Sequence, residues 1–403
     1  MDPQDVVRQL RSRRDRIVAT LSELIAARTV NPPGDEYRAA AVLEEFFNRL
    51  AIPCRKIEKA PGRTNIVGCI GRGLPGKPRV AVVCHLDTVP AGDGWTTDPF
   101  TATLIDGKLY GRGAKDNKGP AAAAMAAVEF LKEREQEIEG QILLVGAADE
   151  ERGSDFGAVF LLQESEFRSL DAAIVPDAGD NMANIDIAEK GLVFLKIICH
   201  GRQAHGSTPE AGVNAIYPMA ELACWLRHWR MPGGTNELFS PPTPTRNVGV
   251  ISGGAAPNMV PARCEMQLDM RYLPGTDEDQ LLAAISNIID RLERKYPGAT
   301  FEIEPMAGDV PTAVDREAPV VAALRQAVED VTGRRPVLFG MSGATVAKQF
   351  IAAGVPAVGI CPGDARTAHV ANEYIPVDEV VDFAAVLTLC LSRLMHSDSS
   401  REA

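Results

Sequence analysis

The sequence has few of the features that would place a protein at a membrane or on a nucleic acid. None of its eight cysteines forms a C-x-x-C pair, and most lie inside apolar runs, which indicates buried free thiols. No segment approaches the ~20 consecutive apolar residues of a membrane span. The formal net charge is −12, so neither nucleic acid nor an anionic membrane surface is expected as a partner.

Targeting and serine-nucleophile motifs are also missing. The first residues, MDPQDVVRQLRSRRDRIVATL, are charged and include no apolar segment followed by a small-residue cleavage site, so a cytoplasmic protein is expected. No G-x-S-x-G motif occurs, which disfavours a Ser-His-Asp hydrolase. Repeats and low-complexity tracts are not evident, and the polar tail HSDSSREA is predicted to be disordered.

What is present has the composition of a globular protein and the length of two domains. The chain has 403 residues, of which 45% are hydrophobic and 24% charged, as in ordinary globular proteins. Domains typically contain ~100–200 residues, so two are expected.

Strand-like and helix-like segments alternate through the first half of the chain. Helices are predicted over residues 3–28 and in GPAAAAMAAVEFLKERE, and a hairpin is predicted at Asp106-Gly107. Buried strands are predicted in NIVGCIG (65–71), VAVVCHLD (80–87), QILLVGAADEE (141–151) and AAIVPDAG (172–179). This alternation predicts an α/β fold with a mostly parallel central sheet.

The pattern changes near residue 190 and changes back near residue 307. Between these points the segments read strand, helix, strand, strand, helix, strand, with helices over 212–230 and 277–294. A helix over 317–332, the strand PAVGICPG and a helix from residue 378 then restore the first pattern. We therefore predict one α/β domain from residues 1–190 and 308–403, with an α+β domain of residues 191–307 inserted into it.

The stretch VAVVCHLDTVP contains a buried strand that ends in His85 and Asp87. Because side chains alternate along a strand, these two residues point to the same side. An imidazole beside a carboxylate can be a catalytic pair, a metal ligand with a supporting partner, or a hydrogen-bonded cap.

Further polar residues follow other predicted strands, namely Asp116, Glu150, Glu151, Asp177 and His369. Ligands of open α/β sheets bind at the carboxyl ends of the strands, and a carboxylate can bridge two metal ions ~3.5–4 Å apart. Each residue alone also fits a cap, a solvated turn or a surface loop. Their occurrence at successive strand ends favours a metal site.

The motifs HLDTVP, GRGAKDNKG, ADEE, PDAG, GRQAHGSTPEAGVNAI, NMVP…DMR and HVANE occur in this order. Together they resemble the di-zinc amidohydrolases and peptidases, which include aminoacylase, glutamate carboxypeptidase, acetylornithine deacetylase and succinyl-diaminopimelate desuccinylase. The resemblance implies a zinc-peptidase-like catalytic domain, and it implies that the inserted α+β domain is a ferredoxin-like dimerisation or lid domain.

The resemblance also implies two divalent metal ions. Their ligands would be His85 and Asp177 in one site, Glu151 and His369 in the other, and Asp116 as a bridge between both. Asp87 would orient His85 through its other ring nitrogen, and the peptide bond after Asp116 would be cis. Zinc is the expected ion, and cobalt or manganese would fit similar ligands.

The resemblance assigns four further residues to the reaction. Glu150 would be the general base, taking a proton from a metal-bridged water and passing it to the leaving amine. His205 would reach across a homodimer interface to stabilise the oxyanion. Asn258 and Arg271 would hold a substrate carboxylate, which a guanidinium binds through two hydrogen bonds. The alternative for Arg271 is an ion pair with Asp269 or another surface acid.

The implied activity is hydrolysis of an amide bond in an N-acyl amino acid or small peptide with a free carboxylate, by a deacylase or carboxypeptidase. One segment, GMSGATVAKQF, departs from acetylornithine and succinyl-diaminopimelate enzymes, because Val346 or its neighbours stand where those carry an acid. The alternative from another class is a non-catalytic metal- or ligand-binding protein on the same fold. The presence of Glu150 and of every expected ligand disfavours that alternative.

Overall fold

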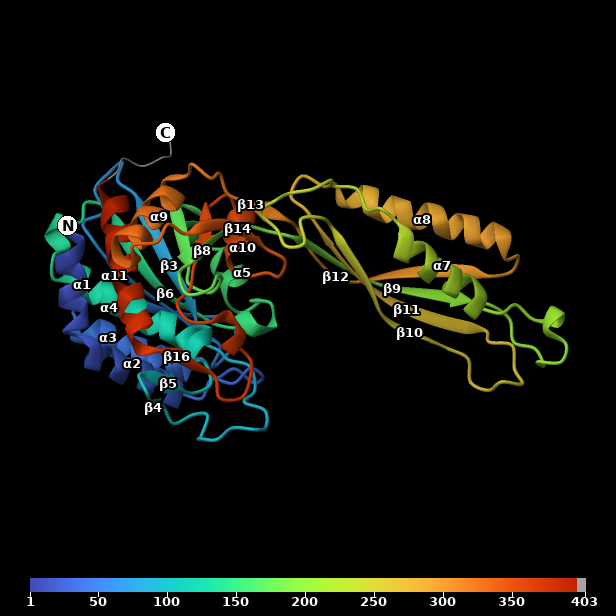
Figure 1. Cartoon of the computed structure of the whole chain (residues 1–403), viewed down its shortest axis with the longest axis horizontal. Coiled ribbons are helices and arrows are strands. Elements are labelled where there is room, and N and C mark those ends of the chain that lie inside the picture. Colours follow the sequence, from blue (N-terminus) through green and yellow to red (C-terminus); the bar gives the residue numbers. More distant parts are fainter. Residues whose placement is uncertain (397–403) are drawn as a thin grey trace. The chain divides into compact units, whose positions relative to one another are not determined.

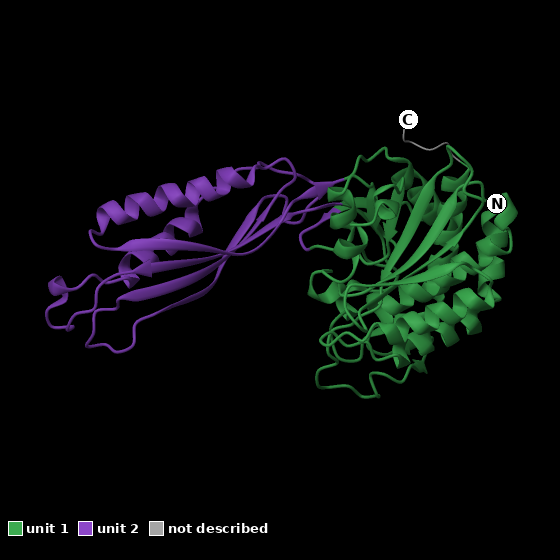
Figure 2. Ribbon diagram, turned by 180° about the vertical axis from the view of Figure 1, so that it is seen from behind, with its two compact units in different colours: residues 1–187, 314–339, 344–403 green, residues 188–313, 340–343 purple. Residues whose placement is uncertain are grey.

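The structure is a computed structural model that describes residues 1–396, so the tail predicted to be disordered lies outside it from residue 397 onward. The chain divides into two compact units (Figure 2). Unit 1 comprises residues 1–187, 314–339 and 344 to the end of the described chain, and unit 2 comprises residues 188–313 and 340–343. Within the described residues, no helix combines the length and the apolar character that crossing a membrane requires.

Unit 1 is an α/β structure, as predicted (Figure 1). Its helices are α1 (Pro3–Arg11), α2 (Arg14–Ala26), α3 (Tyr37–Arg49), α4 (Gly119–Lys132), α5 (Ala158–Leu161), α6 (Ser165–Arg168), α9 (Pro319–Thr332), α10 (Ala347–Ala352) and α11 (Val377–Met395). The main sheet has the spatial order β1 (Cys54–Glu58), β2 (Thr64–Ile70), β6 (Gln141–Ala147), β3 (Arg79–His85), β7 (Ala172–Val175), β15 (Ala357–Gly359), β8 (Asn184–Glu189) and β13 (Thr312–Ala313), and β14 (Val337–Met341) also pairs with β8.

The main sheet is mixed, which corrects the prediction of a mostly parallel sheet. Strands β6, β3, β7 and β15 at its centre are parallel, whereas β1, β2, β8 and β13 pair antiparallel with their neighbours. Parallel pairing needs a crossover of a dozen or more residues, and only residues 59–63 connect β1 to β2. The short connection therefore forces these two strands into an antiparallel pair.

Helices cover both faces of the parallel centre. On one face, Ala81 and Val83 of β3 belong to a buried cluster that includes Phe350 of α10. Val80 and Val82 are equally buried and point to the other face, where α4 and α11 contact β3. Burial on both faces explains why these strands appear in the sequence as continuous apolar runs. It also holds the carboxyl ends of the strands in place.

The N-terminal helix differs from the prediction of one helix over residues 3–28. The chain forms α1 and α2 instead, because the Ser12 hydroxyl donates to the Gln9 carbonyl at 2.6 Å and Arg13 leaves the helical conformation at φ −97° and ψ 4°. The predicted hairpin is confirmed: β4 (Thr103–Ile105) and β5 (Lys108–Tyr110) pair antiparallel across Asp106-Gly107, and β16 (Tyr374–Pro376) pairs with β5.

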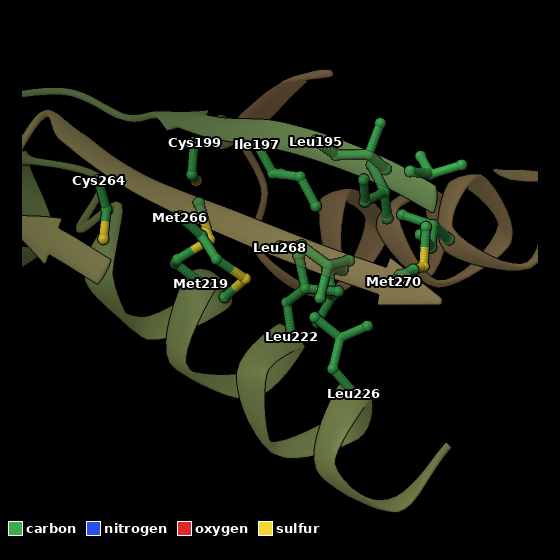
Figure 3. Close-up of a cluster of buried hydrophobic side chains, with 14 of the residues drawn as sticks. Leu195, Ile197, Cys199, Met219, Leu222, Leu226, Cys264, Met266, Leu268 and Met270 are labelled. Atoms are coloured by element: carbon green, nitrogen blue, oxygen red, sulfur yellow. The ribbon is translucent and has the colours of Figure 1, made fainter. Parts of the chain in front are cut away.

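Unit 2 is an α+β structure in which two helices pack on a four-stranded antiparallel sheet. Its two helices are α7 (Ile216–His228) and α8 (Glu278–Lys295), and its four-stranded sheet has the order β10 (Thr245–Gly253), β11 (Arg263–Tyr272), β9 (Gly191–His200), β12 (Thr300–Asp309). Alternate residues of β9 and β11, such as Leu195 and Leu268, point toward Leu222 of α7 and form the core with it (Figure 3). The other side of these strands carries mostly half-buried polar side chains.

Candidate metal centre

The predicted metal-binding residues all lie in unit 1, near the carboxyl ends of its parallel strands. His85 is the last residue of β3, and Asp177 follows closely after β7. Glu150 and Glu151 begin a 3₁₀ turn (Glu150–Arg152) after β6. Asp116 and His369 lie in the loops that follow β5 and β15.

The first group of candidate ligands is His85, Asp116 and Asp177. Nε2 of His85 lies 2.8 Å from Oδ1 of Asp116 and 3.8 Å from Oδ1 of Asp177. The other ring nitrogen, Nδ1, lies 3.1 Å from the carbonyl oxygen of Asp87 and 3.4 Å from its carboxylate. Asp87 therefore holds the ring so that Nε2 faces the two carboxylates.

The second group is Asp116, Glu151 and His369. Nε2 of His369 lies 3.1 Å from Oδ2 of Asp116 and 3.1 Å from Oε2 of Glu151. Asp116 thus belongs to both groups, and each of its carboxylate oxygens faces a different histidine.

These residues fit two divalent cations that share a carboxylate. In each group, one atom from each residue lies within 4.8 Å of the others, so the nitrogen and oxygen donors converge on a common point. A histidine nitrogen with carboxylate oxygens suits zinc, and also cobalt or manganese. His85 would then bind with Asp177, His369 with Glu151, and Asp116 would bridge the ions.

The proton equilibria of the site are those of crowded, buried acids. Burial, followed by repulsion from Asp116, raises the pKa of Asp177 to about 6. Hydrogen bonds to Asp116 and Glu151 raise the pKa of His369 to about 10. At neutral pH the raised pKa of His369 favours its protonated form, so metal binding at this residue must compete with protonation.

Glu150 lies beside the candidate ligands without belonging to either group. Burial, followed by repulsion from Asp177, raises the pKa of its carboxyl well above the ordinary value. Within residues 1–396 its carboxylate has no hydrogen-bond or ion-pair partner, while its backbone N–H donates to Asp87 at 3.0 Å. A carboxylate held in this way is available to exchange a proton.

The loop that carries Asp116 is held by Glu373, to which sequence reasoning assigned no role. The buried Glu373 carboxylate accepts hydrogen bonds from the backbone N–H groups of Lys115 at 2.8 Å and Asp116 at 3.1 Å. It also accepts from the N–H of Gly113 at 3.1 Å and from Nη1 of Arg112 at 2.6 Å. Its place in HVANE close to His369 was the only available signal. The peptide bond after Asp116 is cis, as the resemblance implies.

A second set of residues missed by sequence reasoning surrounds the turn before Glu150. Glu36, Arg63 and Asp149 form ion pairs with little or no solvent contact, and Asn31 joins Asp149 to Asp87. Glu36, Arg63 and Asn31 come from loops in which no periodic pattern marks a partner. Asp149 is adjacent to the Glu150-Glu151 pair, and this adjacency was the only hint.

His205 and Asn258 lie in neighbouring loops of unit 2 and are exposed. The N–H of Gly206 donates to the Asn258 carbonyl at 2.8 Å, which joins the two loops. The N–H of Ser207 donates to Nδ1 of His205 at 3.1 Å. Nδ1 of His205 also lies 2.7 Å from Oγ of Ser207, so both contacts to Ser207 are made through Nδ1.

Arg271 is half-buried on β11 of unit 2 and pairs with Asp269, at 2.8 Å from its Nε to Oδ1 and 3.3 Å from its Nη2 to Oδ2. Its guanidinium also lies 5.4 Å from the ring centroid of Phe194. This ion pair is the alternative that the sequence left open for Arg271. A substrate carboxylate at this position would have to compete with Asp269.

This fold with two ligand groups joined by a shared aspartate defines a two-metal hydrolase. The model of the peptidase family M20/M25/M40 matches residues 81–393, and the chain belongs to this family. The acetylornithine deacetylase of Myxococcus xanthus is 31% identical over 382 residues, covering 92% of this chain and 95% of its own. An uncharacterized metallohydrolase of Methanococcus maripaludis is 30% identical over 414 residues, which cover 94% of this chain and 99% of the relative.

Solved structures show the same fold. Aminopeptidase PepT from Bacillus cereus superposes with a TM-score of 0.77 at 21% identity, covering 94% of this chain and 98% of its own. The predicted α/β fold and the predicted family are thereby confirmed, and the protein is a metallohydrolase of that family.

Proposed function

We propose that the protein hydrolyses the amide bond of an N-acyl amino acid or small peptide with a free carboxylate, using Glu150 as the general base. The observation that carries this proposal is the unpartnered, half-buried carboxylate of Glu150 beside two ligand groups that share Asp116. The name of the relative from Myxococcus xanthus, acetylornithine deacetylase, supports an acyl group on the substrate amine.

The chain's own residues divide the chemistry. Two bound divalent ions, most simply zinc, would polarise the amide carbonyl and acidify water. Glu150 takes the proton and delivers it to the leaving amine, for which its raised pKa suits both steps. Asp87 keeps His85 and the backbone of Glu150 in place through its carbonyl and carboxylate oxygens.

Unit 2 supplies the residues assigned to the substrate. The Nε2–H of His205 would donate to the developing oxyanion, and the contacts of Nδ1 with Ser207 orient the ring for that role. Asn258 and Arg271 would bind the free carboxylate, with Arg271 exchanging Asp269 for the substrate. An Arg271→Ala substitution should raise KM for carboxylate-bearing substrates with little change in kcat, and an unchanged KM would remove Arg271 from this role.

A homodimer formed through unit 2 is part of the proposal. Strand β10 is an edge of its sheet, and Val250 and Ile251 on it are 48% and 50% exposed. Exposed apolar edge strands favour pairing with another chain. Sedimentation should therefore give a dimer, and Ile251→Lys should shift it toward monomer; a wild-type monomer with full activity would contradict the role of His205 across an interface.

The test of the activity is the release of free amine from a panel of N-acyl amino acids and dipeptides. The assay uses zinc- or cobalt-loaded protein beside the Glu150→Gln variant, which keeps the shape of the side chain. Glu150→Gln should bind metal as the wild type does and lose about 10²–10⁴-fold in kcat. Full turnover in the variant would exclude Glu150 as the base, and silence of both proteins with metals bound would favour a binding role.

A further inference from the structure

A buried ion-pair network lies behind the turn that carries Glu150 and Glu151. The Arg63 guanidinium donates from Nε and Nη2 to the two oxygens of Glu36 at 2.8 and 2.7 Å. Nη2 also donates to Oδ1 of Asp149 at 2.7 Å. The side chains of Glu36, Arg63 and Asp149 are only 0%, 13% and 4% exposed, so the pairs are shielded from water and salt.

Asp149 is the residue that this network holds. Its N–H donates back to Glu36 at 3.1 Å, so Glu36 contacts both Arg63 and the backbone of the turn. The Asp149 carbonyl accepts the N–H of Ser154 at 2.6 Å, and Oδ2 accepts the N–H of Phe156 at 3.3 Å. The Arg63 guanidinium in turn lies over the ring of Phe156, with 4.7 Å between Cζ of Arg63 and the ring centroid.

The backbone of Asp149 is in the left-handed region, at φ 65° and ψ 23°. This conformation costs a residue other than glycine about 1–2 kcal/mol and persists only where its surroundings impose it. The backbone conformation of Asp149 sets the direction of the next two residues, Glu150 and Glu151. A return of Asp149 to negative φ would rotate the Glu151 carboxylate away from Asp116 and His369, and would displace Glu150 with it.

The network also reaches the far side of the turn. Nδ2 of Asn31 donates to Oδ1 of Asp149 at 3.0 Å and to Oδ2 of Asp87 at 2.8 Å. The Asp87 carboxylate accepts the N–H groups of Glu150 at 3.0 Å and Glu151 at 3.2 Å. The turn is thus held from both ends.

We propose that Arg63 is a positioning residue for hydrolysis, because its pairing with Glu36 and Asp149 fixes the turn that presents Glu150 and Glu151. This inference rests on the proposed function of Glu150. Lysine could supply the charge of Arg63 but not its fork of donors, which bridges two carboxylates at once.

The experiment compares Arg63→Met, Asp149→Asn and the double variant. Asparagine tolerates the left-handed conformation, so Asp149→Asn removes the charge and leaves the backbone preference in place. The matched control is Arg55→Met, which removes an exposed arginine paired with Glu166. The measurements are kcat, KM and zinc titration of the metal-free protein.

Arg63→Met should lower kcat about 10²-fold, as a ~1 Å displacement of a catalytic group does. KM should stay within about threefold, and zinc affinity should fall about 10–100-fold because Glu151 is displaced. The double variant should lose no more kcat than Arg63→Met, since the two residues act as one unit. Arg55→Met should match the wild type in all three measurements.

A folded Arg63→Met variant with wild-type kcat and zinc affinity would overturn the proposal, and so would additive losses in the double variant. If Arg63→Met does not fold, Arg63→Lys takes its place: reduced kcat with an unchanged Tm supports positioning, and wild-type kcat overturns it. If Glu150→Gln stays active, the proposed function fails. In that case the zinc titration of Arg63→Met still decides whether Arg63 positions Glu151.

Discussion

Replacing Glu373 by glutamine would disturb the loop that carries the shared ligand Asp116 without changing the shape of the side chain. Each carboxylate oxygen of Glu373 accepts two hydrogen bonds, Oε2 from Arg112 and Gly113 and Oε1 from Lys115 and Asp116. Whichever way the new amide lies, its NH₂ group faces two donors. Two hydrogen bonds are therefore lost, and the buried Arg112 loses its counter-charge.

The expected cost follows from these contacts. A hydrogen bond to a charged group contributes about 1.5–3 kcal/mol, so the loss of two gives ~3–6 kcal/mol. In a unit of this size, 1 kcal/mol shifts Tm by ~2–4 °C, which predicts a decrease of about 6–24 °C. The N–H groups of Lys115 and Asp116 also lose an anchor, so zinc affinity should decrease with stability.

The assay is thermal unfolding followed by circular dichroism, with and without zinc. The control is Glu133→Gln, which removes an ion pair to Arg13 from a glutamate that is 48% exposed, so the loss should be no more than ~1 kcal/mol. A decrease in Tm no larger for Glu373→Gln than for Glu133→Gln would refute the reasoning that Glu373 anchors the loop.

Further predictions test the shared ligand, the protonation of the site and the core of unit 2. Asp116→Asn should lower the occupancy of both metal positions and Asp177→Asn of one, as measured by metal analysis after gel filtration; equal losses would contradict a bridging aspartate. Because the pKa of His369 is raised to about 10, this histidine should be protonated at pH 7 in the metal-free protein. Metal binding should then release a proton and weaken as the pH falls, and calorimetry in buffers of different ionisation enthalpy would show no proton release if this is wrong. Leu268→Ala should lower the free energy of unfolding of unit 2 by about 2–5 kcal/mol in denaturant titration, and a loss below that of Gln267→Ala on the same strand would contradict its core position.

Much of unit 1 was predictable because its strands are buried on both faces. Val80 to Val83 form a continuous apolar run that can only be a buried segment, and the polar His85 that ends the run marks the edge where ligands gather. The edges of the sheet were not predictable in this way. The half-exposed pattern of β1 gives no signal for the direction of its partner, so the antiparallel pairs were missed.

The candidate metal ligands were predictable from the order of the motifs along the chain. The residues that hold those ligands in place were not. Asp116 and His369 stand in quoted motifs, but Arg63 and Glu36 are single charged residues in loops. Their pairing depends on how two loops meet in the folded chain. Neither the hydrophobic periodicity of a segment nor its secondary-structure propensity encodes such a contact. The expectations of zinc, a homodimer, a cytoplasmic location and the absence of nucleic-acid partners stay predictions.

The position of β15 has a consequence for synthesis on the ribosome. This strand lies between β7 and β8, although residues 357–359 are made long after either neighbour. The main sheet can therefore be completed only after all residues of unit 2 have been synthesised. His369 follows β15, so the candidate group of His85, Asp116 and Asp177 is synthesised in full long before the group that includes His369.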